Sequence, residues 1–159
     1  TDTLRVVDGL LREAAERYRR SRDEEVPRTA FRALSQFSRN LAILENVRKV
    51  SDTVLAPRLA EITAKHPSVG EVRGLGFFWG LELVRNPETR EPLVPFNASG
   101  AAAGPMNEFA AACKAEGLWP FVHFNRTHVV PPCTTTAEEM NEGLDILDRA
   151  LEVADRFTA

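Results

Sequence analysis

The stretch VGEVRGLGFFWGLELVRN, Val69 to Asn86, decides the fold class because it is dense in β-branched and aromatic residues. Between Phe77 and Val84 the side chains fall into two alternating sets, Phe77, Trp79, Leu81 and Leu83 against Phe78, Gly80, Glu82 and Val84. A period of two predicts a strand. The residues that follow, Asn86 to Arg90, have the composition of a turn.

The glycines of this stretch form the pattern G-x-G-x-x-x-G at Gly74, Gly76 and Gly80. A phosphate-binding fingerprint needs a helix that opens on its glycines, whereas the residues here alternate as in a strand. We therefore interpret the glycines as a bulge or a close backbone approach where two strands meet. A small nucleotide-dependent enzyme is the weakest of the alternatives considered.

Helical periodicity lies on both sides of the predicted strand. Apolar residues recur at steps of three and four in residues 3–20, in a segment that starts near Thr29, and in a third after Ser51 that contains Pro57. Further elements follow the strand: a helix at 105–117, short strands at 118–122 and 127–130, and a last helix behind a Thr136–Glu139 capping box. This order predicts an α+β fold, a small and mainly antiparallel sheet packed with helices and preceded by a helical N-terminal region.

The composition excludes several classes of protein. The chain has 159 residues, of which 43% are hydrophobic and 27% charged, as in a globular domain. A net charge of −3 provides no basic field for nucleic acid or anionic lipid. No apolar run reaches the ~20 residues of a membrane helix, and the first residues lack the layout of a signal peptide. Because Cys113 and Cys133 lie far apart, we expect a cytoplasmic protein with no metal site.

Arg126 is the most informative single candidate for a binding residue. It follows Asn125 in the connection between the two short predicted strands. A planar guanidinium in that place could hold a substrate carboxylate through two hydrogen bonds, with Asn125 beside it. A solvated arginine in a hairpin loop is the alternative. His123, His128 and Cys133 recur at steps of five, but this spacing matches no zinc pattern and no nucleophilic pair with an orienting group.

Four stretches together resemble the C-terminal part of the class III aminotransferases, which are pyridoxal-phosphate (PLP) enzymes of fold type I. They are ENVRKV (45–50), KHPSVGEVRGLGFFWGLELVRNPETREPLVP (65–95), ACKAEGLWPFVHFNRTHVVPPC (112–133) and TAEEMNEGLDILDRALEVAD (136–155). The resemblance implies an aminotransferase-like small domain over residues 45–159. Residues 1–44 are then a helical extension of unclear origin. The sequences REPLVP (90–95) and NRTHVVPPC (125–133) are most similar to those of family branches that use ω- or β-amino acids with pyruvate.

The resemblance implies transamination with PLP as the cofactor, amino acid and keto acid substrates, and a homo-oligomer. The family's Schiff-base lysine belongs to a large domain, and none of Lys49, Lys65 and Lys114 matches its motif. We therefore expect no catalytic or cofactor-binding residue here, PLP bound poorly by this chain alone, and a large domain or partner chain as its partner. Whether the chain is itself an enzyme stays open. The family's substrate-carboxylate arginine aligns with Phe121 or His128, and Arg126 matches neither position.

Two functions from different classes follow. The chain is either a partial class III aminotransferase that supplies the substrate-closing small domain, with Arg126 and Asn125 in contact with the substrate, or a non-catalytic helical interaction module. The apolar stripes of residues 4–18 and 31–47 motivate the second reading.

Overall fold

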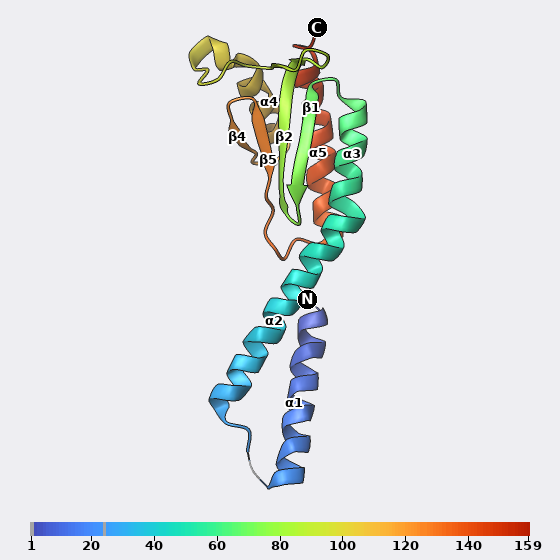
Figure 1. Ribbon diagram of the computed structural model, residues 1–159, viewed down its shortest axis with the longest axis vertical. Coiled ribbons are helices and arrows are strands. Elements are labelled where there is room, and N and C mark those ends of the chain that lie inside the picture. Colours follow the sequence, from blue (N-terminus) through green and yellow to red (C-terminus); the bar gives the residue numbers. More distant parts are fainter. Residues whose placement is uncertain (1, 24) are drawn as a thin grey trace. The chain divides into compact units, whose positions relative to one another are not determined.

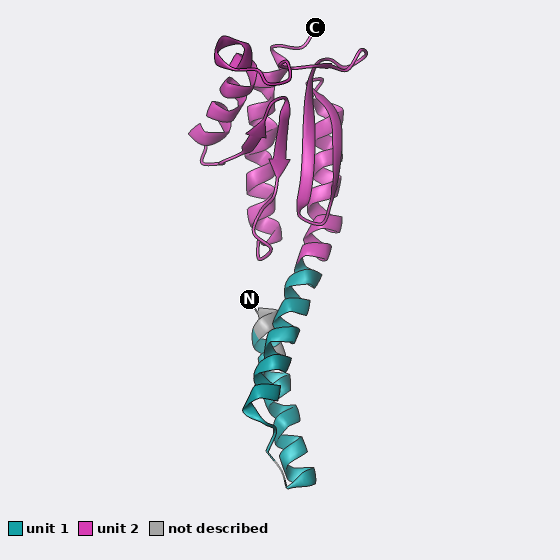
Figure 2. Ribbon diagram, turned by 60° about the vertical axis from the view of Figure 1, so that its left-hand side comes forward, with its two compact units in different colours: residues 1–46 teal, residues 47–159 magenta. Residues whose placement is uncertain are grey.

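The computed structural model describes residues 2–23 and 25–159, apart from the side chains of residues 2–4 and 7. The chain divides into two compact units, residues 1–46 and residues 47–159 (Figure 2). The first unit contains α1 (Asp2–Arg22) and most of α2 (Arg28–Val50), which Arg39 and Asp8 join by an ion pair of 3.1 Å. The predicted stripe on the first helix includes Leu4 and Val7, whose side chains lie outside the described residues.

The second unit is built on an antiparallel sheet. Its strands are β1 (Val69–Leu75), β2 (Phe78–Asn86), β4 (Phe121–His123) and β5 (Arg126–Val129), in the order β1-β2-β5-β4. A short β3 (Glu91–Pro92) pairs with the end of β2. The α+β prediction is confirmed, because an antiparallel sheet is combined with helices in one unit (Figure 1).

The glycine-rich stretch forms a tight hairpin between β1 and β2, so it contributes two strands where the alternation had predicted one. Gly76 turns the chain with a φ of 58°, and the Trp79 indole nitrogen donates a hydrogen bond of 2.8 Å to its carbonyl. A Cβ on Gly74 would lie 2.4 Å from the Trp79 ring, and one on Gly70 would lie 2.4 Å from Val84. The expected close approach of two strands is therefore present.

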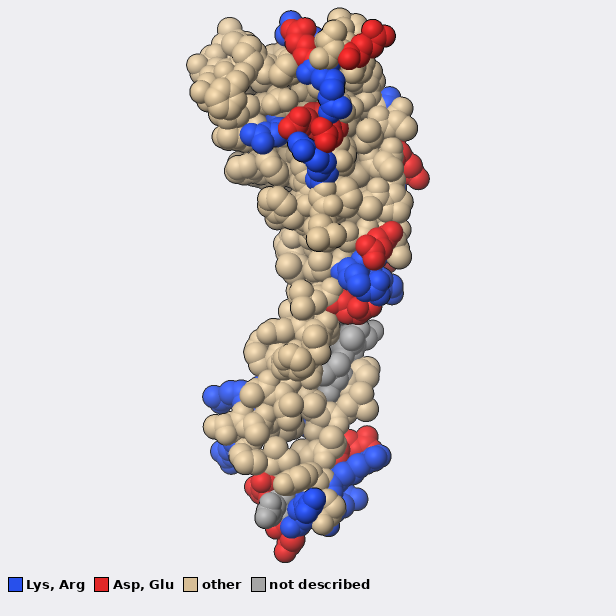
Figure 3. Space-filling view, in the orientation of Figure 1, with Lys and Arg blue, Asp and Glu red and all other residues tan. Residues whose placement is uncertain are grey.

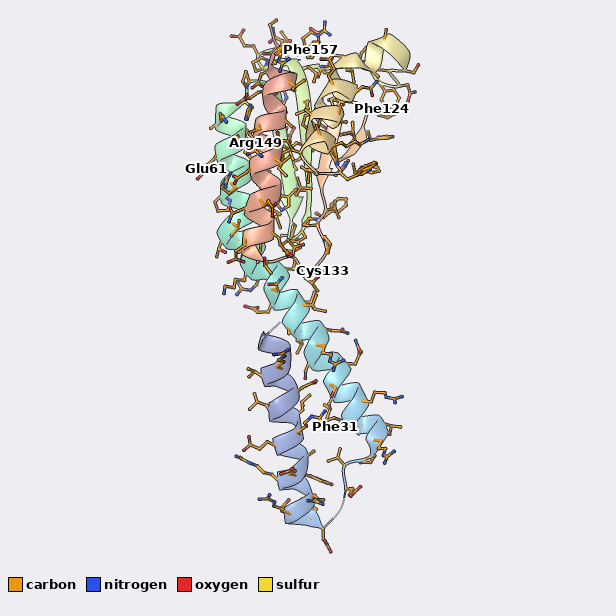
Figure 4. The ribbon with its side chains drawn as sticks, turned by 180° about the vertical axis from the view of Figure 1, so that it is seen from behind. Phe31, Glu61, Phe124, Cys133, Arg149 and Phe157 are labelled. Atoms are coloured by element: carbon orange, nitrogen blue, oxygen red, sulfur yellow. The ribbon has the colours of Figure 1, made fainter. Side chains whose placement is uncertain are left out.

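Helices cover one face of the sheet: α3 (Ala56–Lys65), α4 (Gly104–Ala115), which follows a short 3-10 turn (Gly100–Ala103), and α5 (Ala137–Asp155) (Figures 1 and 4). Between them and the strands lies a core whose fully buried side chains include Leu59, Leu81, Leu83, Phe109 and Leu151. The predicted capping box opens α5: Thr136 Oγ1 accepts a hydrogen bond from the Glu139 N–H, and the Glu139 carboxylate accepts one from the Thr136 N–H. None of the described helices is long and apolar enough to cross a membrane.

A π-helical turn, Ser51–Leu55, connects α2 to α3 without a break. The Ala56 N–H bonds to the carbonyl of Ser51, five residues back. Pro57 then lies in the first turn of α3, where its missing N–H costs no hydrogen bond. The sequence predicted two helices here because neither the spacing nor Pro57 reveals that the helical run is continuous.

His66 fastens the end of α3 to α5. The imidazole is 2% exposed, with Nδ1 2.6 Å from Asp155 Oδ2 and Nε2 2.9 Å from Asp148 Oδ1. Each ring nitrogen therefore faces one carboxylate of α5 at hydrogen-bond distance. Burial opposes the charge on Asp148, but hydrogen bonds from Lys65 and His66 outweigh it and hold the pKa of this carboxyl below its ordinary value.

Candidate functional site

The face of the sheet turned away from the helices carries the polar and aromatic side chains of the strands. Alternation places Phe78, Gly80 and Glu82 of β2 on this outer face, because Leu81 and Leu83 between them are buried. The registers with β2 add Glu71 and Arg73 on β1 and Arg126 and His128 on β5 to the same face. Phe121 and His123 on β4 pair with the β5 residues and complete it. Figure 3 shows intermingled basic and acidic groups within a largely uncharged surface on this side.

Arg126 is the first residue of β5, whereas the sequence had suggested the connection between strands. It stands in register between Glu82 and His123 and is half-buried. Within residues 2–23 and 25–159, no ion pair or hydrogen bond joins its guanidinium to another residue. Arg73, on the same face, lies 3.0 Å from a Glu71 oxygen and 3.4 Å from a Glu82 oxygen. Of these two arginines, Arg126 is the one available to an external anion.

Asn125 and Phe124 form the turn that joins β4 to β5. Phe124 has a φ of 54°, an unusual value for an aromatic residue. The Asn125 Nδ2 donates to the Leu83 carbonyl over 3.2 Å, and the Asn125 carbonyl accepts the Leu83 N–H over 2.7 Å. Asn125 therefore anchors the turn beside β2 and sets where β5 begins, and in the described part of the chain no donor reaches its Oδ1.

His128 lies two residues beyond Arg126 on the same face. Its ring is edge-on to Phe121 at 5.2 Å between centroids and tilted to Phe78 at 6.1 Å. Phe121 and His128 are direct strand partners, so the two positions at which the sequence resemblance would place the arginine are neighbours in space. The Nδ1 of His128 is buried and has no hydrogen-bond partner among the described residues.

The two aromatic neighbours of His128 are unusually exposed. Phe78 is 65% and Phe121 63% exposed, and Leu75 at the tip of the hairpin is 87% exposed. Large apolar side chains grouped on one face mark a surface that another molecule covers. Alternation within residues 121–129 indicates which side chains share a face of the sheet. The strand boundaries had to be known before His123, Arg126 and His128 could be assigned to one face.

The lysines of the chain do not fit a PLP site. A lysine that forms a Schiff base has to lose its proton, yet a hydrogen bond to Asp148 raises the pKa of Lys65. The Lys114 ammonium lies 4.4 Å from the centre of the Trp119 ring, and Lys49 is exposed on α2. In the described part of the chain, no cluster of histidine, cysteine and carboxylate side chains could hold a metal ion.

A family model described as "Aminotransferase class-III" matches residues 28–151, more than three quarters of the chain. The chain belongs to the class III aminotransferases. The match begins in the middle of the segment 1–44 that the sequence analysis had set apart, so residues 28–44 resemble the family as well. PLP follows as the cofactor of the family.

Individual relatives of this class III aminotransferase chain agree. It is 31% identical to taurine–pyruvate aminotransferase of Bilophila wadsworthia over 72% of the chain and 25% of that protein. It is 34% identical to the uncharacterised aminotransferase YhxA of Bacillus subtilis over 59% of the chain and 22% of that protein. The crystal structure of taurine:2-oxoglutarate aminotransferase from Bifidobacterium kashiwanohense, in complex with PLP and glutamate, matches with a TM-score of 0.68 and 29% identity over 80% of the chain and 28% of that structure. The chain spans about a quarter of the length of these relatives.

Proposed function

We propose that this chain supplies the small, substrate-closing domain of a class III aminotransferase. The family match over residues 28–151 carries this proposal, together with the quarter of a relative's length that the chain represents. The parent reaction is the PLP-dependent transfer of an amino group from an amino acid or amine, including ω- and β-amino acids, to a keto acid such as pyruvate. Taurine, the donor named for two of the relatives, is an amine of this kind.

Arg126 and Asn125 are the residues that we propose for contact with the substrate. The Arg126 guanidinium has no partner among the described residues, which leaves its donors free for a carboxylate. The Asn125 Nδ2 donates to the Leu83 carbonyl, so Oδ1 is the group of this side chain left to accept a hydrogen bond from the substrate. No catalytic residue is assigned to this chain.

The cofactor and the reacting lysine belong, in this proposal, to a large domain or partner chain. The exposed side chains Leu75, Phe78 and Phe121 give that partner an apolar surface to cover. Residues 45–159 form the aminotransferase-like domain in this proposal, and the helices of residues 1–44 precede it. A homo-oligomer of the assembled protein fits the same proposal.

The test is complementation. The chain is mixed with taurine–pyruvate aminotransferase of Bilophila wadsworthia from which the matching quarter has been removed. We expect a complex in sizing chromatography with light scattering, and transamination that neither piece shows alone. Arg126→Gln should raise KM for the amino acid donor about tenfold, whereas Arg73→Gln on the same face should leave it unchanged. Absence of a complex would overturn the proposal.

A separate measurement tests the cofactor. The chain alone, treated with PLP and then with borohydride, should give no stable adduct. A trapped adduct on Lys49, Lys65 or Lys114, found by peptide mass mapping, contradicts the assignment of the reacting lysine to a partner.

A non-catalytic helical interaction module is the second candidate, and one observation favours it. On α2, the side chains of Leu34, Phe37, Leu41 and Leu44 are 50–64% exposed and follow steps of three, four and three. That spacing is typical of a helix–helix seam. Light scattering of the chain alone tests this reading: a monomer that unfolds in one cooperative transition excludes an obligate helical partner.

A further inference from the structure

A cavity of about 550 Å³ lies in the first unit, where the end of α1 meets the start of α2. Its apolar lining comes from three segments: Ala15 lies on α1, Val26 on the connection between the helices and Phe31 near the start of α2. Figure 4 shows Phe31 on the side of α2 that faces α1, where its ring is half-buried. A cavity of this size with an aromatic wall is typical of a binding site for a small molecule.

Three arginines line the same cavity. Arg19 lies in the last turn of α1, and Arg28 and Arg32 lie four residues apart at the start of α2. Side chains four residues apart share one face of a helix, with about 5–6 Å between their Cβ atoms. Two helices thus bring three guanidinium groups to one cavity.

These three guanidinium groups lack counter-charges. Among the described side chains, none of them lies within ion-pair distance of a carboxylate, whereas their neighbours on α1 are paired: Arg17 lies 2.6 Å from Glu13, and Arg20 lies 3.6 Å from Glu16. Glu16 and Glu25 also line the cavity. Because Arg20 already compensates Glu16, a single acidic residue remains against three arginines, and the cavity has an excess of positive charge.

The arginines at the start of α2 are unfavourable for the helix itself. The N-terminal end of a helix carries a partial positive charge, so carboxylates stabilise the first turn and cations destabilise it. The helix α2 begins with Arg28 and has no acidic residue in its first turn. Like charges four residues apart, as at Arg28 and Arg32, also repel each other. A bound anion offsets both penalties, and guanidinium groups hold phosphate oxygens through paired hydrogen bonds.

We propose that this cavity is a binding site for an aromatic phosphate, a phosphomonoester group attached to an aromatic ring. Arg19, Arg28 and Arg32 donate hydrogen bonds to the phosphate oxygens, and the ring packs against Phe31 and Val26. A phosphomonoester carries nearly two negative charges at neutral pH, which suits the excess of basic groups. This inference goes beyond the proposed function, because every residue that carries it precedes residue 33.

Calorimetric titration of the full chain tests the site. Phenyl phosphate, inorganic phosphate and phenol are added separately, since the first has both the acid group and the ring and the others have one each. We expect saturable binding of phenyl phosphate, binding of inorganic phosphate that is at least tenfold weaker, and no binding of phenol. Absence of saturable binding of phenyl phosphate overturns the proposal. Equal affinity for inorganic phosphate, which means an adventitious ion only, or for phenol overturns it as well.

Arg32→Gln is the decisive variant. It should weaken binding of phenyl phosphate at least tenfold, and the chain without ligand should melt at the same or a higher temperature because the repulsion from Arg28 is gone. Arg17→Gln is the matched control, since it removes the same charge from an exposed helical position outside the cavity lining. It should bind as the unaltered chain does. Equal losses of affinity in the two variants, or no loss in a folded Arg32→Gln chain, overturn the proposal.

Phe31→Leu tests the ring separately from the charges. Leucine keeps an apolar side chain in the cavity but removes the aromatic surface, so binding of phenyl phosphate should weaken several-fold while that of inorganic phosphate stays unchanged. Unchanged affinity for phenyl phosphate in the folded variant overturns the assignment to an aromatic phosphate.

Discussion

The two faces of the sheet in residues 47–159 differ in what their side chains do. The inner face holds Leu81, Leu83 and Thr127, all at most 1% exposed, beneath the three helices. The outer face holds Arg126, His128 and Phe78, which are exposed or half-buried and only partly supplied with partners. Since successive residues of one strand serve both faces, the same short segments fold the domain on one side and present chemistry on the other. Stability and function should therefore respond to different substitutions in a single strand.

The largest effect on stability is expected from a substitution that leaves a cavity on the inner face. Leu81→Ala removes a fully buried side chain from the central strand and should lower the free energy of unfolding by about 3 kcal/mol. Chemical denaturation monitored by circular dichroism measures it. A loss below about 1 kcal/mol would show that the core does not depend on this face.

The next largest effect on stability is expected at His66, whose ring lies between Asp148 and Asp155. His66→Gln leaves Asp148 and Asp155 without the imidazole that lies between them and should cost about 2 kcal/mol of unfolding free energy. Lys65→Gln, which removes an exposed partner of the same Asp148, is the control and should change stability little. Because the pKa of Asp148 is lowered in the fold, its contribution is complete above about pH 4 and is lost as the pH falls below that value. Equal losses of unfolding free energy in the two variants would show that His66 contributes no more to stability than the exposed Lys65.

Cys113 makes the inner layer sensitive to alkali. Burial raises the pKa of its thiol to about 11, above the value of the unfolded chain. The neutral thiol therefore contributes fully at and below pH 8, and stability is lost as the pH rises from about 9 towards 11, by up to about 2 kcal/mol. Thermal melts at pH 8 and pH 10.5 measure this change. Cys113→Ala should be less stable at pH 8 but show a flatter alkaline dependence, and an equal slope in both chains contradicts the assignment.

The cap of α5 is expected to matter less. Thr136→Ala removes the acceptor for the Glu139 N–H and should cost about 1 kcal/mol. Thr136→Ser keeps the hydroxyl and should restore most of it, as urea titrations would show. No difference between the two variants would mean that the capping box adds nothing to the helix.

The smallest effect is expected on the outer face. Phe78→Ser removes a side chain that is 65% exposed and should change the unfolding free energy by no more than about 0.5 kcal/mol. It should nevertheless weaken the complex with the truncated relative. A large loss of stability would show that the outer face takes part in folding, and the contrast between the faces would collapse.

The sequence predicted the α+β class, the helical periods and the capping box, because each depends on residues close together in the chain. It did not separate β1 from β2, since the glycines that make the hairpin also interrupt the alternation. His66 and the carboxylates that it contacts are more than 80 residues apart in the chain, so no local pattern predicts this contact. Arg126 was singled out from its neighbours alone. Its shared face with His128 and Gly80 depends on the register of three strands, which alternation alone does not set.

The π-turn at Ser51–Leu55 has a consequence for how this segment tolerates insertions and deletions. Val50 and Leu55 are both buried although they are five residues apart, a step that an ordinary α-helix would place on different faces. The wide turn absorbs one residue more than the regular repeat allows. Removing a single residue between Ser51 and Leu55 would restore regular α-helix with the two buried residues four apart, which places them about 40° from each other around the axis and still on one face. A one-codon deletion there would thus shorten the helix while keeping both side chains directed at the core, whereas one made elsewhere in the helix would rotate one of them away by about 100°.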